Sequence, residues 1–194
     1  MAAVTSLPWG RPLTRADVRE LPDDGHRYEL LDGMLLVSPS PTHRHQRAVT
    51  RLGLLLGNAC PSDQELLVAP FDVVLADDTV LQPDLLVADV RDLADARVPL
   101  APHLVVEVLS PSTRRVDLLL KRSRYEAAGV PAYWIVDPEE PSLTVLELVE
   151  LRYVETARVV HPGGRGRAPL PAHRRPSGAG RVRWVQTRGL DCAA

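Results

Sequence analysis

The most restrictive feature of the chain is the apolar segment from Leu104 to Leu109, which is interrupted by a single carboxylate, Glu107. Apolar runs of this length are typical of a β-strand buried on both faces. An ionised carboxylate in such a strand is costly unless a cation or hydrogen-bond donors meet it. Glu107 therefore needs a partner. The ordinary alternatives are a neutral side chain or a pair with an arginine.

The rest of the sequence alternates helix and strand patterns around this segment. A short helix is expected after Thr14, and the Asp32-Gly33 pair predicts the tight turn of a β-hairpin over residues 28–37. The further expected elements are a helix over 42–58, strands over 66–75, 84–88 and 104–109, a helix that begins at Thr113 or Asp117 and ends near Ala128, and strands over 132–136 and 143–149. This order predicts an α/β fold in which a mixed β-sheet is flanked by helices and preceded by an N-terminal β-hairpin.

The length of 194 residues allows one domain with a hydrophobic core and an extension. We expect the domain to span residues 1–160. Residues 161–194 are rich in Gly, Pro and Arg without apolar periodicity, which predicts a disordered tail. No segment resembles a signal peptide or a membrane span, so we expect a cytoplasmic protein with no membrane partner.

Charge is distributed unevenly along the chain. Residues 1–160 carry 24 acidic residues against 16 Lys or Arg, whereas residues 161–194 carry seven Arg and one acidic residue. An acidic body argues against tight, sequence-independent binding to nucleic acid, which depends on Lys and Arg. A local basic cleft remains compatible with it. The candidates for phosphate contacts are Arg44, Arg47, Arg51, Arg114 and Arg115, with ordinary surface roles as the alternative.

Lys121 is the only lysine in the chain. Lysine is a compact point charge whose pKa responds to burial, whereas arginine is a planar fork that stays protonated. A site that stabilises one developing oxyanion or positions one water can therefore require lysine. The alternative is a solvated helix residue paired with Asp117 one turn earlier.

A second carboxylate, Asp84, stands at the start of the predicted strand over 84–88. Two carboxylates at the ends of neighbouring strands, together with a main-chain carbonyl such as that of Val108 and waters, form an all-oxygen site suited to Mg²⁺ or Mn²⁺. Lys121 is then the positive group beside the metal. The alternative for Asp84 is an ordinary Pro-Asp turn before a strand.

Four stretches resemble a known family when taken in order: YELLDGMLLVSPSPTHRHQ, PFDVVLADDTVLQPDLLVAD, PHLVVEVLSPSTRRVD and KRSRYEAAGVPAYWIVDP. They are similar to the Uma-type restriction endonucleases, a branch of the PD-(D/E)xK nuclease superfamily. The resemblance covers roughly residues 20–150 and implies a restriction-endonuclease-like core in which Asp84 and Glu107 bind a divalent metal. The superfamily's simplest pattern places a lysine where this chain has Leu109, and Lys121 matches a lysine supplied instead from the following helix.

Two further residues of the matching stretches are candidate accessory groups. Glu29 could add a carboxylate near the metal, and the alternative is an edge-strand acid that faces water. His45 lies on the core-facing stripe of its predicted helix and could point into a cleft, whereas a satisfied core histidine is the alternative. Residues 161–194 resemble no part of the family.

These observations favour a Mg²⁺- or Mn²⁺-dependent endonuclease that hydrolyses DNA phosphodiester bonds. Asp84 and Glu107 would hold the metal, and Lys121 would orient the attacking water or offset charge in the transition state. The expected partner is DNA, and a homodimer is compatible with the sequence. A catalytically inactive nuclease-like module that binds nucleic acid is the main alternative, and a hydrolase of another phosphate ester is a third.

Overall fold

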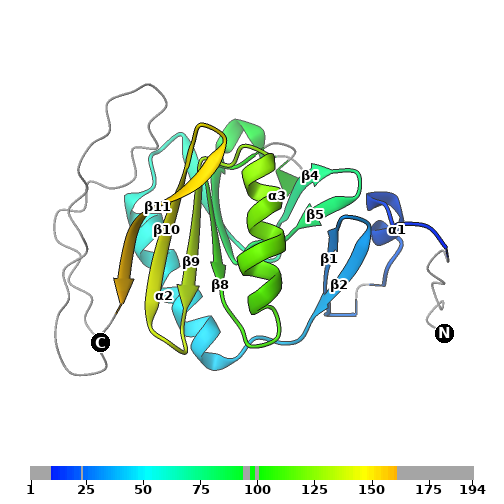
Figure 1. Ribbon diagram of the computed structural model, residues 1–194, viewed down its shortest axis with the longest axis horizontal. Coiled ribbons are helices and arrows are strands. Elements are labelled where there is room, and N and C mark those ends of the chain that lie inside the picture. The colour runs from blue at the N-terminus through cyan, green and yellow to red at the C-terminus, as the bar shows by residue number, and fades with distance from the viewer. Residues whose placement is uncertain (1–9, 23, 94–96, 99–100, 161–194) are drawn as a thin grey trace.

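The computed structural model describes residues 10–22, 24–93, 97–98 and 101–160 (Figure 1). The helices are α1 (Arg15–Arg19), α2 (His43–Ala59), the 3₁₀ turn η1 (Val90–Asp92), the π-helical segment η2 (Val116–Lys121) and α3 (Arg122–Ala127). The strands are β1 (Arg27–Leu31), β2 (Met34–Ser38), β3 (Gln64–Val68), β4 (Asp72–Ala76), β5 (Thr79–Leu81), β6 (Leu85–Asp89), β7 (Arg97–Val98), β8 (Leu104–Val108), β9 (Ala132–Asp137), β10 (Ser142–Val149) and β11 (Arg152–Val160).

The strands form two mixed sheets. The smaller has the order β2-β1-β5-β4-β7, and the larger has the order β11-β10-β9-β8-β6-β3. Each sheet contains one parallel pair, β4 with β7 and β8 with β9, and the other pairs are antiparallel. The predicted α/β class with an N-terminal hairpin is confirmed, with the strands divided between two sheets instead of one.

The elements next to the N-terminus form as their sequence predicts. The backbone N–H and hydroxyl of Thr14 both donate to Asp17, which completes the capping box of α1. Asp32 and Gly33 have φ of 52° and 76°, the left-handed conformations that a two-residue hairpin turn requires. The hairpin of β1 and β2 is therefore in register from Arg27 opposite Ser38 to Leu31 opposite Met34.

The expected strand over 66–75 is wrong as a single element. It is divided into β3, in the larger sheet, and β4, in the smaller sheet. Pro70 stands between them and has no N–H to donate to a ladder, so the run of apolar residues does not continue as one strand. The short strands β5 and β7 and the long strand β11 were not expected, and they extend both sheets.

The six-stranded sheet is covered on both faces, as the apolar pattern of β8 predicts. In Figure 1, α2 lies behind this sheet and α3 in front of it. Val49 and Leu56 of α2 pack on one face, against a cluster that includes Val106 and Val108. Tyr125 of α3 packs on the other face.

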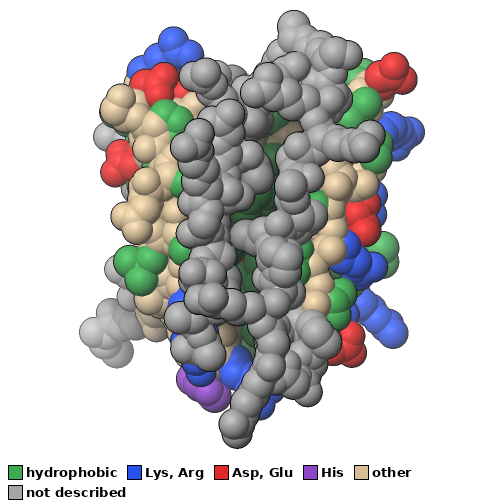
Figure 2. Space-filling model, turned by 90° about the vertical axis from the view of Figure 1, so that its left-hand side faces the viewer, with side chains coloured by type: hydrophobic (Ala, Val, Ile, Leu, Met, Phe, Trp, Pro, Cys, Tyr) green, Lys and Arg blue, Asp and Glu red, His purple; other side chains and the backbone are tan. Residues whose placement is uncertain are grey.

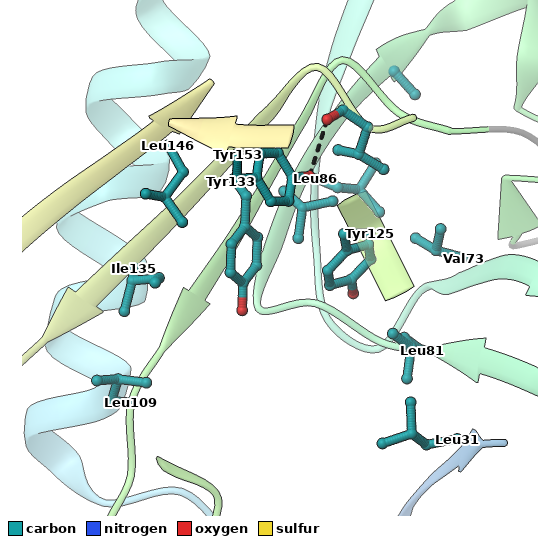
Figure 3. Packing of buried hydrophobic residues seen from close by; sticks show 13 residues of the cluster. Leu31, Val73, Leu81, Leu86, Leu109, Tyr125, Tyr133, Ile135, Leu146 and Tyr153 are labelled. Atoms are coloured by element: carbon teal, nitrogen blue, oxygen red, sulfur yellow. Dashed lines mark hydrogen bonds between the residues drawn. The ribbon is translucent and has the colours of Figure 1, made fainter. Parts of the chain in front are cut away.

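A second core cluster joins α3 to both sheets (Figure 3). The rings of Tyr125 and Tyr133 lie 5.4 Å apart between centroids, and those of Tyr133 and Tyr153 lie 5.8 Å apart. The Tyr153 hydroxyl donates to the carbonyl of Val130 across 2.9 Å. Leu31 of the hairpin belongs to the same cluster, so the N-terminal hairpin is part of the common core.

Figure 2 views the molecule from the side on which β11 lies in Figure 1, and charged side chains of both signs follow the two margins of this face. Within the described residues, no helix has the length and apolarity needed to cross a membrane. The predicted tail over 161–194 lies outside the described residues.

Candidate active site

Asp84 and Glu107 are brought together by the pairing of β6 with β8. Leu85 pairs with Val106 in an antiparallel ladder, so Asp84, just before Leu85, lies beside Glu107, just after Val106. The backbone N–H of Val108 donates to Oδ2 of Asp84 across 2.8 Å and fixes the carboxylate at the strand end. Both side chains are buried. The predicted carboxylate pair on neighbouring strands is therefore present in the structure.

Lys121 lies inside the fold, against Glu107 of this pair. Its Nζ is 3.2 Å from Oε1 of Glu107, 2.9 Å from Oε1 of Glu29 and 3.4 Å from Oδ1 of Asp117. Only 3% of its side chain is exposed. The alternative of a solvated surface pair with Asp117 is therefore wrong, although the pairing with Asp117 itself is present.

The segment that carries Lys121 is a π-helix, η2, where an ordinary α-helix was expected. Both Asp117 and Lys121 of η2 are buried, while Leu119 and Leu120 are exposed. The Thr113 hydroxyl donates to Oδ2 of Asp117 across 2.6 Å. Wide helical turns of this kind are frequent at functional sites. Here the wide turn carries a carboxylate and the only lysine on its inner side.

The two accessory candidates belong to the same cluster. Glu29 is buried on β1, which lies between β2 and β5, and its Oε1 accepts the backbone N–H of Gln82 across 2.7 Å. The alternative of an edge-strand acid facing water is therefore wrong. His45, near the start of α2, is buried, and its Nε2 lies 3.2 Å from Oδ2 of Asp84. It is a core residue that also faces the carboxylates.

Three members of the cluster were not identified from the sequence. Arg27 reaches Asp84 with Nη1, at 3.0 Å from Oδ1, and Tyr125 donates from its hydroxyl to Oε1 of Glu107 across 3.4 Å. Asp117 was considered only as a surface partner. Spacing could have indicated two of them, because Asp117 and Tyr125 each lie one helical turn from Lys121, whereas the contact of Arg27 with Asp84 joins residues 57 positions apart.

Carboxyl groups outnumber cations among the described residues of this cluster. The four carboxylates of Glu29, Asp84, Glu107 and Asp117 face two permanent cations, Arg27 and Lys121. Burial raises the pKa of Glu107 well above its ordinary value. The charge of Lys121 lowers this pKa, and the neighbouring carboxylates of Asp117, Asp84 and Glu29 raise it. Burial likewise raises the pKa of Asp117.

The pKa values of Asp84 and Lys121 are shifted in the directions that favour their charged forms. Burial by itself would raise the pKa of Asp84, but the hydrogen bond with His45 and the charge of Arg27 outweigh it and lower that pKa. Burial would lower the pKa of Lys121, but the carboxylates of Glu107 and Glu29 outweigh it and raise that pKa. The pKa values of the neighbouring Asp84 and Glu107 are therefore shifted in opposite directions.

This donor set fits a hard dication. Among the described residues, no three His, Cys, Asp or Glu side chains are arranged as a complete metal site. Mg²⁺ does not need such a cage, because it is usually held by one or two carboxylates together with waters and substrate phosphates. Asp84 and Glu107 supply two carboxyl groups, Glu29 lies in the same cluster, and the carboxyl groups outnumber the cations. That the main-chain carbonyl of Val108 is a metal ligand stays a prediction.

The five arginines predicted to contact phosphate lie on the surface. Arg44 pairs with Glu139 at 2.8 Å, and Arg114 pairs with Asp137 at the end of β9. Arg47, Arg51 and Arg115 are exposed. Arg44, Arg47 and Arg51 lie on α2, the helix that also carries His45, and their role in binding DNA stays a prediction.

Comparison with known proteins agrees with the resemblance in the sequence. A search of curated proteins finds no match. A crystal structure from Anabaena variabilis ATCC 29413, described as "a putative nuclease belonging to DUF820", matches with a TM-score of 0.65 at 16% sequence identity, over 82% of this chain and 90% of that chain. It shows a shared fold. The sequence model of the Uma2 family, described as "Putative restriction endonuclease", matches residues 15–170, and the chain therefore belongs to the Uma2 family.

Proposed function

We propose that the protein is a Mg²⁺- or Mn²⁺-dependent endonuclease that hydrolyses phosphodiester bonds of DNA. The observation that carries the proposal is the convergence of Asp84, Glu107 and Lys121 in one buried cluster in which carboxylates outnumber cations. Membership of a family described as restriction endonucleases and a nuclease-like fold support the same reaction class.

Asp84 and Glu107 are the proposed metal ligands, with Glu29 as an additional carboxylate. When bound, the dication would polarise the scissile phosphate and lower the pKa of a water near it. Asp84 suits this role because the Val108 N–H and His45 fix its orientation and favour its charged form. Glu107 would lose its proton as the dication binds, because the added positive charge offsets its raised pKa.

Lys121 is proposed to orient the attacking water or to offset charge in the transition state. Its ammonium is fixed by three carboxylates, which is the preorganisation that electrostatic catalysis requires. It is also deeply buried, so a water is a better-sized partner for it than a bulky phosphate group. The DNA backbone would be held by surface arginines near the start of α2 and by Arg114 and Arg115.

Cleavage of supercoiled plasmid DNA in Mg²⁺, compared with the same reaction in EDTA, tests the proposal. We expect nicked and linear products in Mg²⁺ only, and loss of both in Asp84→Ala. Retained DNA binding without cleavage in the wild type would favour the inactive binding module instead. Hydrolysis of a small phosphodiester without any cleavage of DNA would favour a hydrolase of another phosphate ester.

A further inference from the structure

Arg27 is the most exposed of the charged groups that meet in the cluster. Its side chain is 23% exposed, against 10% for His45, 5% for Asp84 and 3% for Lys121. A metal ion or a phosphate that approaches from solvent therefore meets Arg27 before it meets the carboxylates. Lys121, by contrast, is deeply buried and contacts Glu29 and Glu107.

The guanidinium of Arg27 bridges two of the carboxylates proposed to hold or support the metal. Nη1 lies 3.0 Å from Oδ1 of Asp84, and Nη2 lies 3.6 Å from Oε1 of Glu29. The other oxygen of Asp84 already accepts the N–H of Val108 and faces His45. Oδ1 is therefore the oxygen that Asp84 can offer to a cation, and Arg27 occupies it.

One N–H donor of the same guanidinium, at Nε, is buried and has no hydrogen-bond acceptor among the described residues. A buried donor without an acceptor is unusual in a stable arrangement and costs free energy. Arginine also matches phosphate oxygens with a planar fork of N–H groups, a geometry that lysine lacks.

We propose that Arg27 competes with the dication for Asp84 and Glu29, and that the arginine released from these carboxylates binds a phosphate oxygen of the DNA. This inference rests on the proposed function. It makes metal binding and DNA binding depend on one side chain. The presence of metal strengthens the binding of DNA, and by linkage DNA strengthens the binding of metal by the same factor.

The first test measures Mn²⁺ binding to the full chain by electron paramagnetic resonance of the free ion. Arg27→Gln removes the competing charge, so we expect its affinity for Mn²⁺ to be tighter than that of the wild type by about fivefold or more. Arg124→Gln is the matched control, because Arg124 forms an ion pair of similar kind with Asp32 outside the cluster, at 2.6 Å. The control should bind Mn²⁺ as the wild type does.

The second test measures binding of a labelled DNA duplex by fluorescence anisotropy, with and without Ca²⁺ as a hard dication in place of Mg²⁺. We expect Arg27→Gln to weaken DNA binding about tenfold in Ca²⁺ and to change it little without Ca²⁺. Arg27→Lys provides the same comparison if Arg27→Gln does not fold. Lysine lacks the planar fork whose two terminal nitrogens reach Asp84 and Glu29 separately, so Mn²⁺ should bind about twofold tighter or more, and DNA binding in Ca²⁺ should still weaken.

Unchanged Mn²⁺ affinity in both Arg27 variants, or an equal loss of DNA binding with and without Ca²⁺, overturns the inference. If the wild type nevertheless cleaves DNA with Mg²⁺, the proposed function stands without it. If neither the wild type nor Arg27→Gln binds Mn²⁺, the metal site is wrong and both proposals fail together.

Discussion

Nζ of Lys121 lies 2.9 Å from Oε1 of Glu29, so the helix that follows β8 meets the N-terminal hairpin at a buried ion pair. Glu29 belongs to the five-stranded sheet, whereas Glu107, the other close partner of Lys121, belongs to the six-stranded sheet. The lysine therefore joins the two sheets at the candidate site. The geometry of the site depends on how the sheets pack as well as on the strand that carries Glu107.

Metal should stabilise the fold through the carboxylate pair. A dication that binds the folded chain and not the unfolded chain stabilises the fold, so Mg²⁺ or Mn²⁺ should raise the melting temperature of the wild type, by an amount equivalent to about 2.7 kcal/mol at a hundred times Kd. Asp84→Ala and Glu107→Ala should each lose most of this gain. Thermal unfolding with and without metal measures it, and an equal shift in all three proteins would exclude the site.

Replacing Lys121 with arginine should separate catalysis from metal binding. Lys121→Arg keeps the positive charge, but the larger planar group cannot occupy the buried place of the ammonium. Loss of a positioned charge of this kind typically costs on the order of 10²-fold in rate. Plasmid cleavage should therefore fall by about that factor, while the stabilisation by metal persists. Arg122→Lys, at the adjacent and more exposed position, is the control, and wild-type cleavage by Lys121→Arg would remove the lysine from the mechanism.

Local sequence patterns predict the turns, the helix starts and the buried strands of this fold that depend on neighbouring residues alone. The Asp32-Gly33 turn, the start of α2 after Thr42 and the buried strand around Glu107 follow from turn, capping and burial preferences, and the structure confirms them. The strand β11 does not follow from such patterns. Its turn is made by Glu150 and Leu151 at φ of 49° and 64°, conformations that sequence reasoning reserves for Gly, Asn or Asp.

The candidate site likewise contains residues that the sequence indicates and residues that only the tertiary structure brings together. Glu107 and Lys121 stand out in the sequence, one as a charge in an apolar strand and the other as the only lysine. Arg27 does not stand out, because an arginine at the start of a strand is ordinarily a surface residue. Its contact with Asp84 joins residues 57 positions apart and depends on the packing of two sheets. Only the tertiary structure brings these two residues together.

The raised pKa of Glu107 predicts a pH-dependent effect of removing its charge. A carboxyl whose pKa is higher in the folded than in the unfolded chain contributes stability below its unfolded pKa and loses it as pH rises through the folded pKa. Glutamine does not titrate. Without metal, Glu107→Gln should therefore gain stability over the wild type as pH rises from about 4.5, by at most about 1.4 kcal/mol per pH unit.

Urea unfolding in EDTA, at several pH values between about 5 and 8, measures this difference in stability. Glu65→Gln is the control, because Glu65 is an exposed carboxylate on β3. Its difference from the wild type should be small across the range. A Glu107→Gln difference that does not change with pH would show that Glu107 has no raised pKa in the folded protein.

Gly33→Ala should destabilise the hairpin and, through it, the proposed metal site. Gly33 has a φ of +76°, and an added Cβ would lie 2.4 Å from Cβ of Pro12. Gly25→Ala is the matched control, because Gly25 has a φ of +81° but an added Cβ would meet nothing within 4 Å. The Gly25→Ala control should lower the free energy of unfolding by about 1–2 kcal/mol because of the left-handed backbone alone, and Gly33→Ala should lower it by about 1–3 kcal/mol more because of the clash.

Since the hairpin carries Glu29 and Arg27, Gly33→Ala should also weaken Mn²⁺ binding, whereas Gly25→Ala should not. Equal losses of stability in urea unfolding, or Mn²⁺ binding unaffected in both variants, would show that the turn at Gly33 does not support the site.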